Sequence, residues 1–320
     1  MRWLHPVRGV QVAAEAGASA PGGVEGATTR AGFVALAGRP NVGKSTLVNR
    51  LVETKVGIVS DKPQTTRREL RGVVTGDSWQ MVLCDLPGFQ RPRDVLTERM
   101  QARVERSLAD SDVVLFIVSA AEPIGAGDRF IAESVRAAHK PTVVAVNKID
   151  AVDRETTALA LLEVEKLGLP GEIFPVSAKT GENVAALRDH LVTLLPEGPF
   201  LYPPEVRSDL PPELAFAELV REQVLLRTRE EVPHAVEVEV SDIEQRDDGS
   251  LVVHADIWCE TESQKGILIG RGGQMIKAIG SAARREMSLL AGTTVHLDLR
   301  VRVRKRWRKD ESLVERLGIG

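Results

Sequence analysis

The sequence predicts an α/β domain with a mostly parallel sheet and helices on both faces, followed by a smaller α+β domain. From Phe33 onward, short β-rich runs alternate with helix-length segments. A proline-rich stretch without apolar periodicity interrupts this pattern near residue 196, and a different order of helices and strands follows it. The 320 residues, 43% hydrophobic and 27% charged, are enough for two ordinary globular domains.

Composition excludes several classes of protein. The longest apolar runs, at 113–118 and 142–146, are much shorter than the roughly 20 residues that cross a bilayer. The only two cysteines, Cys84 and Cys259, are far apart and have no metal-ligand spacing. Neither a disulfide framework nor a zinc site is therefore expected. We expect a monomer in a reducing, cytoplasmic compartment.

Four segments divide the chain. Residues 1–31 have no apolar period and no signal-peptide core, so we expect a disordered or removable extension there. The first domain covers 32–198, a semi-rigid proline-rich linker covers 199–212, and the second domain covers 213–320. In the first domain, strands are expected at 33–37, 70–74, 80–85, 112–120, 142–147 and 172–177.

The second domain has its own order of elements. A helix is expected first, then two alternating strands joined by a DDG turn, a glycine-rich turn between two helical segments, and a last strand. The expected ranges are 213–230 and 274–290 for helices and 235–244, 250–260 and 294–304 for strands.

A glycine-rich phosphate loop follows the first strand. Gly38, Gly43, Lys44 and Ser45 match G-x-x-x-x-G-K-S, and a helix-like run comes next, which is the context that this motif requires. The glycines let backbone N–H groups face the phosphates, Lys44 reaches the β- and γ-phosphates, and the Ser45 hydroxyl binds Mg²⁺. The loop residues expected to contact nucleotide are Gly38, Arg39, Pro40, Asn41, Val42, Gly43, Lys44, Ser45 and Thr46.

Two further segments would complete the phosphate and metal site. Asp85 ends the third β-rich run, where its carboxylate can reach Mg²⁺ through water and the Gly88 N–H can sense the γ-phosphate. In the polar loop 63–67, Thr66 is our choice for a hydroxyl that joins the Mg²⁺ shell when the γ-phosphate is present, with Thr65 as the alternative. The expected catalytic residues are Lys44, Thr66, Asp85 and Gly88.

The base-recognition motifs follow the fifth and sixth β-rich runs. An aspartate at Asp150 can accept hydrogen bonds from both guanine N1–H and the 2-amino group, and adenine offers neither donor. The Ala178 N–H is expected on the guanine carbonyl. The residues expected to form this part are Asn147, Lys148, Asp150, Ser177, Ala178 and Lys179. All five motifs in this order predict GTP binding.

The motifs GRPNVGKS, PQTTR, DLPG, NKID and SAK resemble those of the translation-factor-related GTPases, and their spacing is most similar to the Era family. The resemblance covers about 32–195 and implies a GTPase with GTP or GDP and Mg²⁺ as cofactors. Leu86 replaces the usual Thr, at a position where the backbone does the work. Phe89 stands where Ras-like proteins place a water-orienting glutamine, and no internal arginine finger is identifiable, so slow intrinsic turnover is expected. Asn41 resembles an asparagine that holds K⁺ in related GTPases, and a loop-capping role is an equal alternative.

A G-x-x-G turn lies in the second domain, between two apolar helical segments. Together with the order of elements it is typical of a type II KH fold. Its glycines allow close approach to a sugar-phosphate backbone, while Ile267, Ile269, Ile276 and Ile279 can line a groove for bases.

The charge is distributed unevenly along the second half of the chain. Residues 201–258 hold 5 Lys or Arg against 14 Asp or Glu, whereas 259–310 hold 12 against 5. Alternation places three arginines on one face of the last strand, and Trp307 beside them is expected to be available for stacking. We favour phosphate binding over a solvated strand edge, with an anionic membrane surface as the rival partner. The residues expected to bind RNA are Lys265, Ile269, Gly270, Arg271, Gly272, Gly273, Lys277, Arg284, Arg300, Arg302, Arg304, Lys305 and Arg306.

The order of GTPase domain, proline-rich linker and KH domain resembles Era over nearly 290 residues. This resemblance implies a switch that binds near the 3′ end of 16S ribosomal RNA and assists assembly of the 30S subunit and rRNA maturation. One alternative is a division-signalling GTPase at the inner face of the cell membrane, whose basic end binds anionic lipid. The other is a constitutive RNA-binding protein whose nucleotide state does not change its affinity for RNA.

Overall fold

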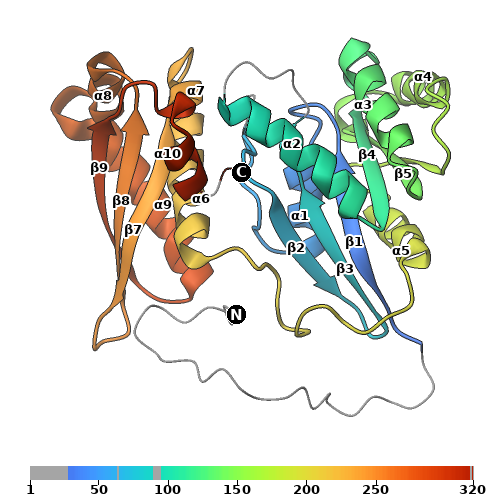
Figure 1. The fold of residues 1–320 in the computed structure, drawn as a ribbon, viewed down its shortest axis with the longest axis horizontal. Coiled ribbons are helices and arrows are strands. Elements are labelled where there is room, and N and C mark those ends of the chain that lie inside the picture. The colour runs from blue at the N-terminus through green and yellow to red at the C-terminus, as the bar shows by residue number, and fades with distance from the viewer. Residues whose placement is uncertain (1–27, 63–64, 89–94, 318, 320) are drawn as a thin grey trace.

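The computed structural model describes residues 28–62, 65–88, 95–317 and 319. Two bodies lie next to each other, one around a six-stranded sheet and one around a three-stranded sheet (Figure 1). The predicted combination of an α/β domain with a smaller α+β domain is confirmed. Within the described part of the chain, no helix is both long enough and apolar enough to cross a membrane.

The first sheet has the strand order β2-β3-β1-β4-β5-β6. Every neighbouring pair is parallel except β2 and β3, which are antiparallel. The strands are β1 (Arg30–Ala37), β2 (Leu70–Thr75), β3 (Trp79–Asp85), β4 (Val113–Ser119), β5 (Thr142–Asn147) and β6 (Ile173–Pro175). All six were expected, and β6 is shorter than predicted.

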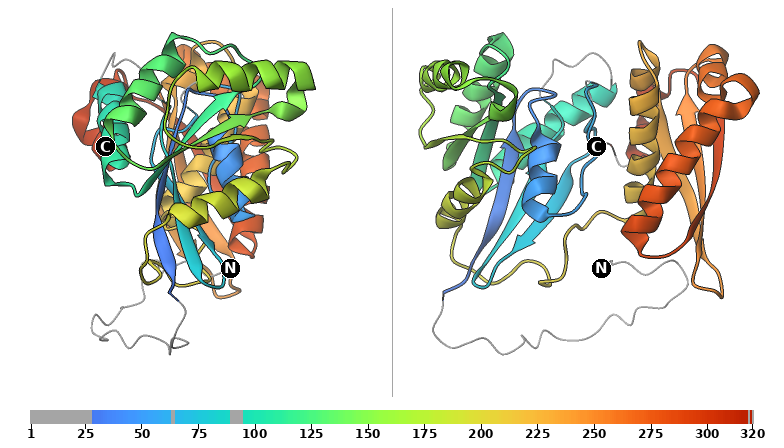
Figure 2. Two further views of the ribbon diagram at one scale, coloured as in Figure 1. Left: turned by 90° about the vertical axis from the view of Figure 1, so that its right-hand side faces the viewer. Right: turned by 180° about the vertical axis from the view of Figure 1, so that it is seen from behind.

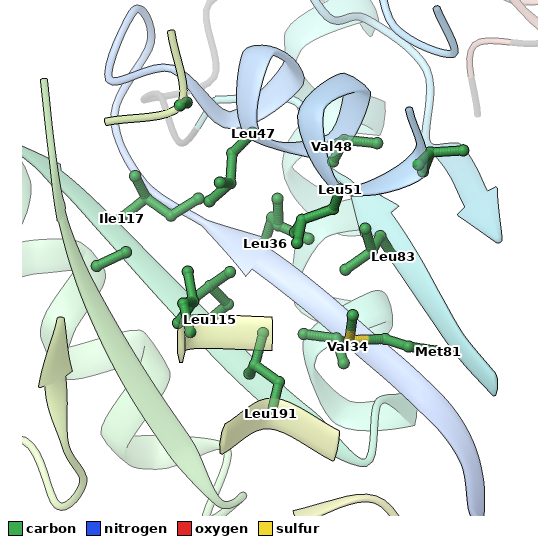
Figure 3. Close-up of a cluster of buried hydrophobic side chains, with 14 of the residues drawn as sticks. Val34, Leu36, Leu47, Val48, Leu51, Met81, Leu83, Leu115, Ile117 and Leu191 are labelled. Carbon is green, nitrogen blue, oxygen red and sulfur yellow. The ribbon is translucent and has the colours of Figure 1, made fainter. Parts of the chain in front are cut away.

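Helices cover both faces of this sheet, as the near-continuous apolar strands require. On one face lie α1 (Lys44–Val52) and α5 (Val184–Leu194), and on the other lie α2 (Val95–Asp110), α3 (Ala126–Ala137) and α4 (Arg154–Glu165). Figure 3 shows Leu47, Val48 and Leu51 of α1 pointing at strand residues such as Leu36 and Leu83. The short 3₁₀ turn η1 (Ile149–Ala151) follows β5.

This topology brings the motif loops together. The phosphate loop, the D-x-x-G segment and the two base-recognition loops come after β1, β3, β5 and β6. These four strands run in the same direction, so their carboxyl ends lie at one edge of the sheet. Loops from distant parts of the sequence can therefore form one site.

The two segments expected to be irregular differ from prediction. Arg30 and Ala31 belong to β1, so the extension predicted for 1–31 ends too late; residues 1–27 lie outside the described part. The proline-rich linker lies against the sheet, because the Val73 N–H donates to the Arg207 carbonyl at 2.9 Å and Gln80 Nε2 donates to the Tyr202 carbonyl at 2.8 Å. It is therefore bound to the first domain over part of its length.

The second domain packs its helices on one face of the sheet β7-β8-β9 (Figure 2). Its elements are α6 (Pro212–Arg227), α7 (Val232–Ala235), β7 (Glu237–Gln245), β8 (Leu251–Cys259), α8 (Glu262–Ile269), η2 (Arg271–Gly273), α9 (Gln274–Ala291) and β9 (Val295–Val303). β7 and β8 are antiparallel, and β8 and β9 are parallel. Apart from the short α7, this is the predicted order.

Two elements after β9 were not predicted. They are η3 (Trp307–Lys309) and α10 (Glu311–Arg316). Trp307, Val314 and Leu317 form a buried apolar cluster with Leu96 and Met100 of α2. The C-terminal segment therefore packs against the first domain, as Figure 1 also shows for α10 and α2.

Candidate functional site

The phosphate loop connects β1 to α1. Gly43 has a φ of 99°, and a Cβ there would lie 2.2 Å from Asn147 Nδ2, so only glycine fits. The Lys44 ammonium group donates to the carbonyl oxygens of Gly38 at 3.1 Å and Arg39 at 3.0 Å. Burial lowers the pKa of Lys44 to about 8, although Asp85 opposes this effect. A buried cation is thus held within the loop.

A cavity of about 320 Å³ opens beside this loop. It is lined by Pro40, Asn41, Gly43, Lys44, Ser45, Thr46, residues 58–61, Thr65, Thr66, Gly88 and Lys148. The structure therefore gathers residues from the phosphate loop, the threonine loop, the D-x-x-G segment and one base-recognition loop. Phe89, Pro63 and Gln64, which belong to the predicted motifs, lie outside the described residues.

Three oxygen-bearing side chains meet beside the cavity, and two of them, Ser45 and Thr66, line it. Ser45 Oγ lies 2.5 Å from Asp85 Oδ2 and 3.1 Å from Thr66 Oγ1. The Thr65 hydroxyl instead donates to the Lys62 carbonyl at 2.6 Å. This geometry favours Thr66 over Thr65.

The chemistry of this cluster fits Mg²⁺, a hard cation that prefers oxygen ligands. Asp85 is fully buried, and among the described residues its Oδ1 has no hydrogen-bond partner. Burial raises the pKa of the Asp85 carboxyl above its usual value, although Lys44 and Ser45 lower it. A cation near Asp85 would stabilise the ionised carboxylate. Ser45, Thr66 and Asp85 could therefore hold the metal, and the contact of Asp85 through water stays a prediction.

The base-recognition loops are joined to the phosphate loop by Asn147. Its Nδ2 donates to the Val42 carbonyl at 2.8 Å, and its Oδ1 accepts from the Ala178 N–H at 2.9 Å. In this structure the Ala178 N–H therefore has a side-chain acceptor, and its predicted contact with the guanine carbonyl stays a prediction that requires this donor to be shared or released. Asp150 Oδ1 accepts from the Ser177 hydroxyl at 2.6 Å, which orients the carboxylate.

Other predicted nucleotide-site residues have partners that the motifs did not reveal. Arg39 Nε donates to Asp128 at 2.8 Å. Asn41 Nδ2 donates to the Asp61 carbonyl at 2.7 Å, which supports a loop-stabilising role; K⁺ binding stays a prediction. Lys179 is 82% exposed, and its Nζ lies 4.0 Å from Asp150.

The G-x-x-G turn joins α8 to α9 in the second domain. Gly270, Gly272 and Gly273 have φ values of 72°, 58° and 76°, which side chains rarely adopt. Arg271 is exposed at this turn. The two helices therefore meet at a turn whose backbone is open to close approach.

A second cavity of about 510 Å³ lies between α9 and β9. Its lining residues are Ile276, Lys277, Gly280, Ser281, Arg284 and 296–299. Ile276, Gly280 and Arg284 are spaced by four, so they share a helix face. Ile279 was expected in the groove, but it is fully buried on the core face of α9.

Three arginines of the basic C-terminal run have acidic partners that the sequence pattern did not predict. Arg300 pairs with Asp298 at 2.6 Å, Arg302 pairs with Asp256 at 2.8 Å, and Arg304 pairs with Asp310. Lys305 and Arg306 are exposed, and Lys265 is half-buried.

The prediction that Trp307 is available for stacking is wrong. Trp307 is fully buried, and its Nε1 donates to the Ala235 carbonyl at 2.8 Å. Local alternation predicts only which side of a strand a residue occupies, and this tryptophan follows the strand in a 3₁₀ turn packed between domains.

A buried ionic cluster joins the domains, and it was not predicted. Arg67 Nη1 contacts Glu237 Oε2 at 2.8 Å, Arg68 contacts Glu218 and Glu237, and Arg221 contacts Glu218 at 2.5 Å. Burial alone would raise the pKa of Glu237, but Arg68, Arg67 and Arg221 lower it to about 2. The doubled arginine after the predicted threonines was the only visible indication of this cluster.

The fold and the nucleotide cavity define a P-loop GTPase domain joined to a KH domain. The family model described as a 50S ribosome-binding GTPase matches residues 33–148, and the KH domain model matches residues 231–308. The chain is 46% identical over 294 residues to GTPase Era of Mycobacterium sp. (strain KMS), covering 90% of this chain and 98% of that protein. It is 44% identical over 290 residues to GTPase Era of Caldanaerobacter subterraneus subsp. tengcongensis, covering 90% and 97%. The chain belongs to the Era family of GTPases.

Solved structures agree with this assignment. The structure of a single-residue variant of Aquifex aeolicus Era bound to GDP·AlF₄⁻ matches with a TM-score of 0.88 and 38% identity, over 91% of this chain and 100% of that one. An Era complex with MgGDPNP and nucleotides 1506–1542 of 16S ribosomal RNA matches with the same TM-score and identity, over 91% and 99%. The predicted GTPase activity and family are confirmed.

Proposed function

We propose that this chain is a guanine-nucleotide switch whose KH domain binds the 3′ end of 16S ribosomal RNA during assembly of the 30S subunit in the cytoplasm. The observation that carries the RNA part is the G-x-x-G turn beside the groove between α9 and β9. Similarity to an Era structure that contains 16S nucleotides 1506–1542 supports the choice of RNA.

The nucleotide site would bind the phosphates through positively charged and N–H groups held at constant positions. The Lys44 ammonium group and the loop N–H groups would bind the β- and γ-phosphates, while Ser45, Thr66 and Asp85 would hold Mg²⁺. Bound Mg²⁺ neutralises charge on the phosphate oxygens. Slow intrinsic turnover stays a prediction, since Phe89 lies outside the described residues.

Guanine recognition would rest on Asp150. Its carboxylate is held by the Ser177 hydroxyl, so one oxygen is oriented before a base arrives. Asn147 keeps this loop at a constant position relative to the phosphate loop through Val42. The base and the phosphates would therefore be recognised by parts of one connected unit.

RNA would be held by the turn and the groove together. The glycines of η2 allow the backbone to approach phosphates, and Arg271, Lys277 and Arg284 supply positive charge nearby. The strand arginines would contribute less than predicted, because Asp256, Asp298 and Asp310 already pair with them.

The test changes Arg271 and Gly272 together to Asp. Neither change fills occupied space, because a Cβ at Gly272 would meet no atom within 4 Å, and Asp tolerates a positive φ better than most residues. Two carboxylates at the turn should weaken binding of an RNA with the sequence of 16S nucleotides 1506–1542 by at least about 100-fold at low salt, and by less as salt rises. A scrambled RNA provides the specificity comparison.

The control is Arg246→Asp on the exposed β7–β8 hairpin, which alters charge in the same domain at the end of the sheet opposite the G-x-x-G turn (Figure 1). A thermal melt verifies folding of both variants. If the folded turn variant binds RNA as the parent does, the KH assignment of the RNA site is wrong. Equal affinity with a GTP analogue and with GDP would favour a constitutive RNA-binding protein, and turn-independent binding to anionic liposomes would favour the membrane alternative.

A further inference from the structure

We propose that Arg221, which belongs to the second domain, is a positioning residue for the GTPase site of the first. It would hold the backbone that presents Thr66 to the magnesium site, so this inference rests on the proposed role of Thr66 as a metal ligand. The Arg221 side chain lies on α6 and is 1% exposed. Its Nη2 donates to the carbonyl oxygen of Thr65, the residue directly before Thr66.

The geometry of the peptide bond transmits this contact to Thr66. A peptide unit is planar, so the Thr65 carbonyl oxygen and the Thr66 Cα lie in one rigid plane. Holding the oxygen restricts the direction in which the Thr66 side chain leaves the backbone. Thr66 Oγ1 lies 3.1 Å from Ser45 Oγ, whereas the Thr65 hydroxyl points to the Lys62 carbonyl. Arg221 therefore acts on Thr66 through the backbone.

Charge in the buried cluster makes this carbonyl contact strong. Three guanidinium groups, from Arg67, Arg68 and Arg221, meet two carboxylates, from Glu218 and Glu237, and each side chain is at most 4% exposed. A buried guanidinium donor without an acceptor is costly, and two carboxylates offer too few oxygens for three guanidinium groups. Backbone carbonyls, including that of Thr65, supply further acceptors.

The same helix also holds the chain before and after Thr66. Glu222 Oε1 accepts from the Val59 N–H at 3.0 Å, upstream of the threonine. Glu218 pairs with Arg68, downstream of it. Two side chains of α6 thus contact the loop on both sides. This arrangement limits the movement of Thr66 relative to the second domain.

The main variants are Arg221→Met, which removes the donors, and Arg221→Lys, which keeps a charge and fewer donors. We expect Arg221→Met to raise the Mg²⁺ concentration for half-maximal binding of a fluorescent non-hydrolysable GTP analogue by about tenfold, as for loss of a charged hydrogen bond. GDP affinity should stay within about twofold, because the threonine is expected to join the metal shell only with a γ-phosphate. Arg221→Lys should restore part of the parent value, and it carries the test if Arg221→Met does not fold.

A double-variant cycle separates positioning from general destabilisation. In a Thr66→Ala background, Arg221→Met should have no further effect on the Mg²⁺ midpoint, because both changes act on the same hydroxyl. Additive effects would overturn the inference. A parent-like midpoint for Thr66→Ala would overturn the proposed metal role of Thr66 and this inference with it. If Thr66→Ala raises the Mg²⁺ midpoint but Arg221→Met leaves it unchanged, the inference about Arg221 is overturned while the metal role of Thr66 stands.

Glu286→Gln is the matched control. It weakens another contact between the domains, the 3.2 Å ion pair of Lys55 with Glu286, without touching Thr65. Its Mg²⁺ midpoint should equal that of the parent. A shift as large as that of Arg221→Met would assign the effect to domain packing in general and would overturn the inference.

Discussion

Asn147 donates its side-chain N–H to the carbonyl oxygen of Val42 at 2.8 Å, across 105 residues of sequence. The same side chain accepts from the Ala178 N–H. One buried amide therefore connects the phosphate loop with both base-recognition loops, and Gly43 leaves the space that it needs.

Asn147→Ala should weaken both nucleotide binding and the fold. The change leaves the buried Val42 carbonyl and Ala178 N–H without this partner, at a cost of about 1–3 kcal/mol for each group. Denaturant unfolding and GTP titration measure the two effects. Thr193→Ala, which removes an exposed hydrogen bond to the His190 carbonyl, is the control and should change neither quantity appreciably. A stable Asn147→Ala with parent affinity would contradict this role.

Asp150→Asn should weaken GTP binding and shift preference toward xanthine nucleotides. The amide can donate to the carbonyl at xanthine position 2 but accepts less well from the guanine amino group, and each lost charged hydrogen bond costs about 1.5–3 kcal/mol. Competition between GTP and XTP for the site measures the shift. Unchanged GTP affinity without any gain for XTP would remove Asp150 from the base site.

Lys44→Ala should lower the affinity for GTP more than the affinity for guanosine. The buried ammonium group is aimed along the phosphate loop, so its loss affects only ligands that carry phosphates. A loss of at least about tenfold for GTP is expected from one charge-assisted contact. If the variant hydrolyses GTP at the parent rate, the assignment of Lys44 to the phosphate-binding loop is wrong.

Glu237→Gln should destabilise the contact between the domains by about 3–5 kcal/mol, because three buried guanidinium groups would then face one carboxylate. The pKa of Glu237 is lowered from 4.5 to about 2 in the folded protein. Its charge therefore stabilises the fold above pH 4.5, and this contribution is lost as pH falls from 4.5 toward about 2.

Urea unfolding of the parent and Glu237→Gln at several pH values checks this prediction. The difference between them should be largest near neutral pH and should shrink below pH 4.5. The exposed Asp189→Asn serves as a control for the loss of a surface carboxylate. A difference that stays constant down to low pH would show that the charge of Glu237 is not the source of stability.

Contacts between the two domains bear on whether the GTPase domain and the KH domain act independently. A semi-rigid linker alone would keep the two domains apart, and changes in the KH turn would then leave GTP hydrolysis unaffected. Arg67, Arg68 and Thr65 of the first domain instead contact α6 and β7 of the second. Measurements of RNA binding and of GTP hydrolysis are therefore best made on the full chain.

The sequence by itself determined the succession of helices and strands along the chain, the GTPase motifs and the G-x-x-G turn. These depend on short-range patterns: apolar runs form buried strands, and glycines at set positions permit backbone conformations that phosphates require. The sequence favoured Thr66 as the hydroxyl that joins the Mg²⁺ shell, but Thr65 stayed an alternative. The structure supports the choice, because Thr66 faces Ser45 and Asp85 while Thr65 faces Lys62.

Only the tertiary structure decided which side chains have partners from distant segments. Trp307 looked exposed beside basic residues, yet it is buried between domains, and the strand arginines proved to have acidic partners on β8 and near the chain end. The contact of Arg221 with the Thr65 carbonyl joins residues 156 positions apart. Such pairings depend on how the two domains pack against each other, and local spacing along the chain carries no record of that packing.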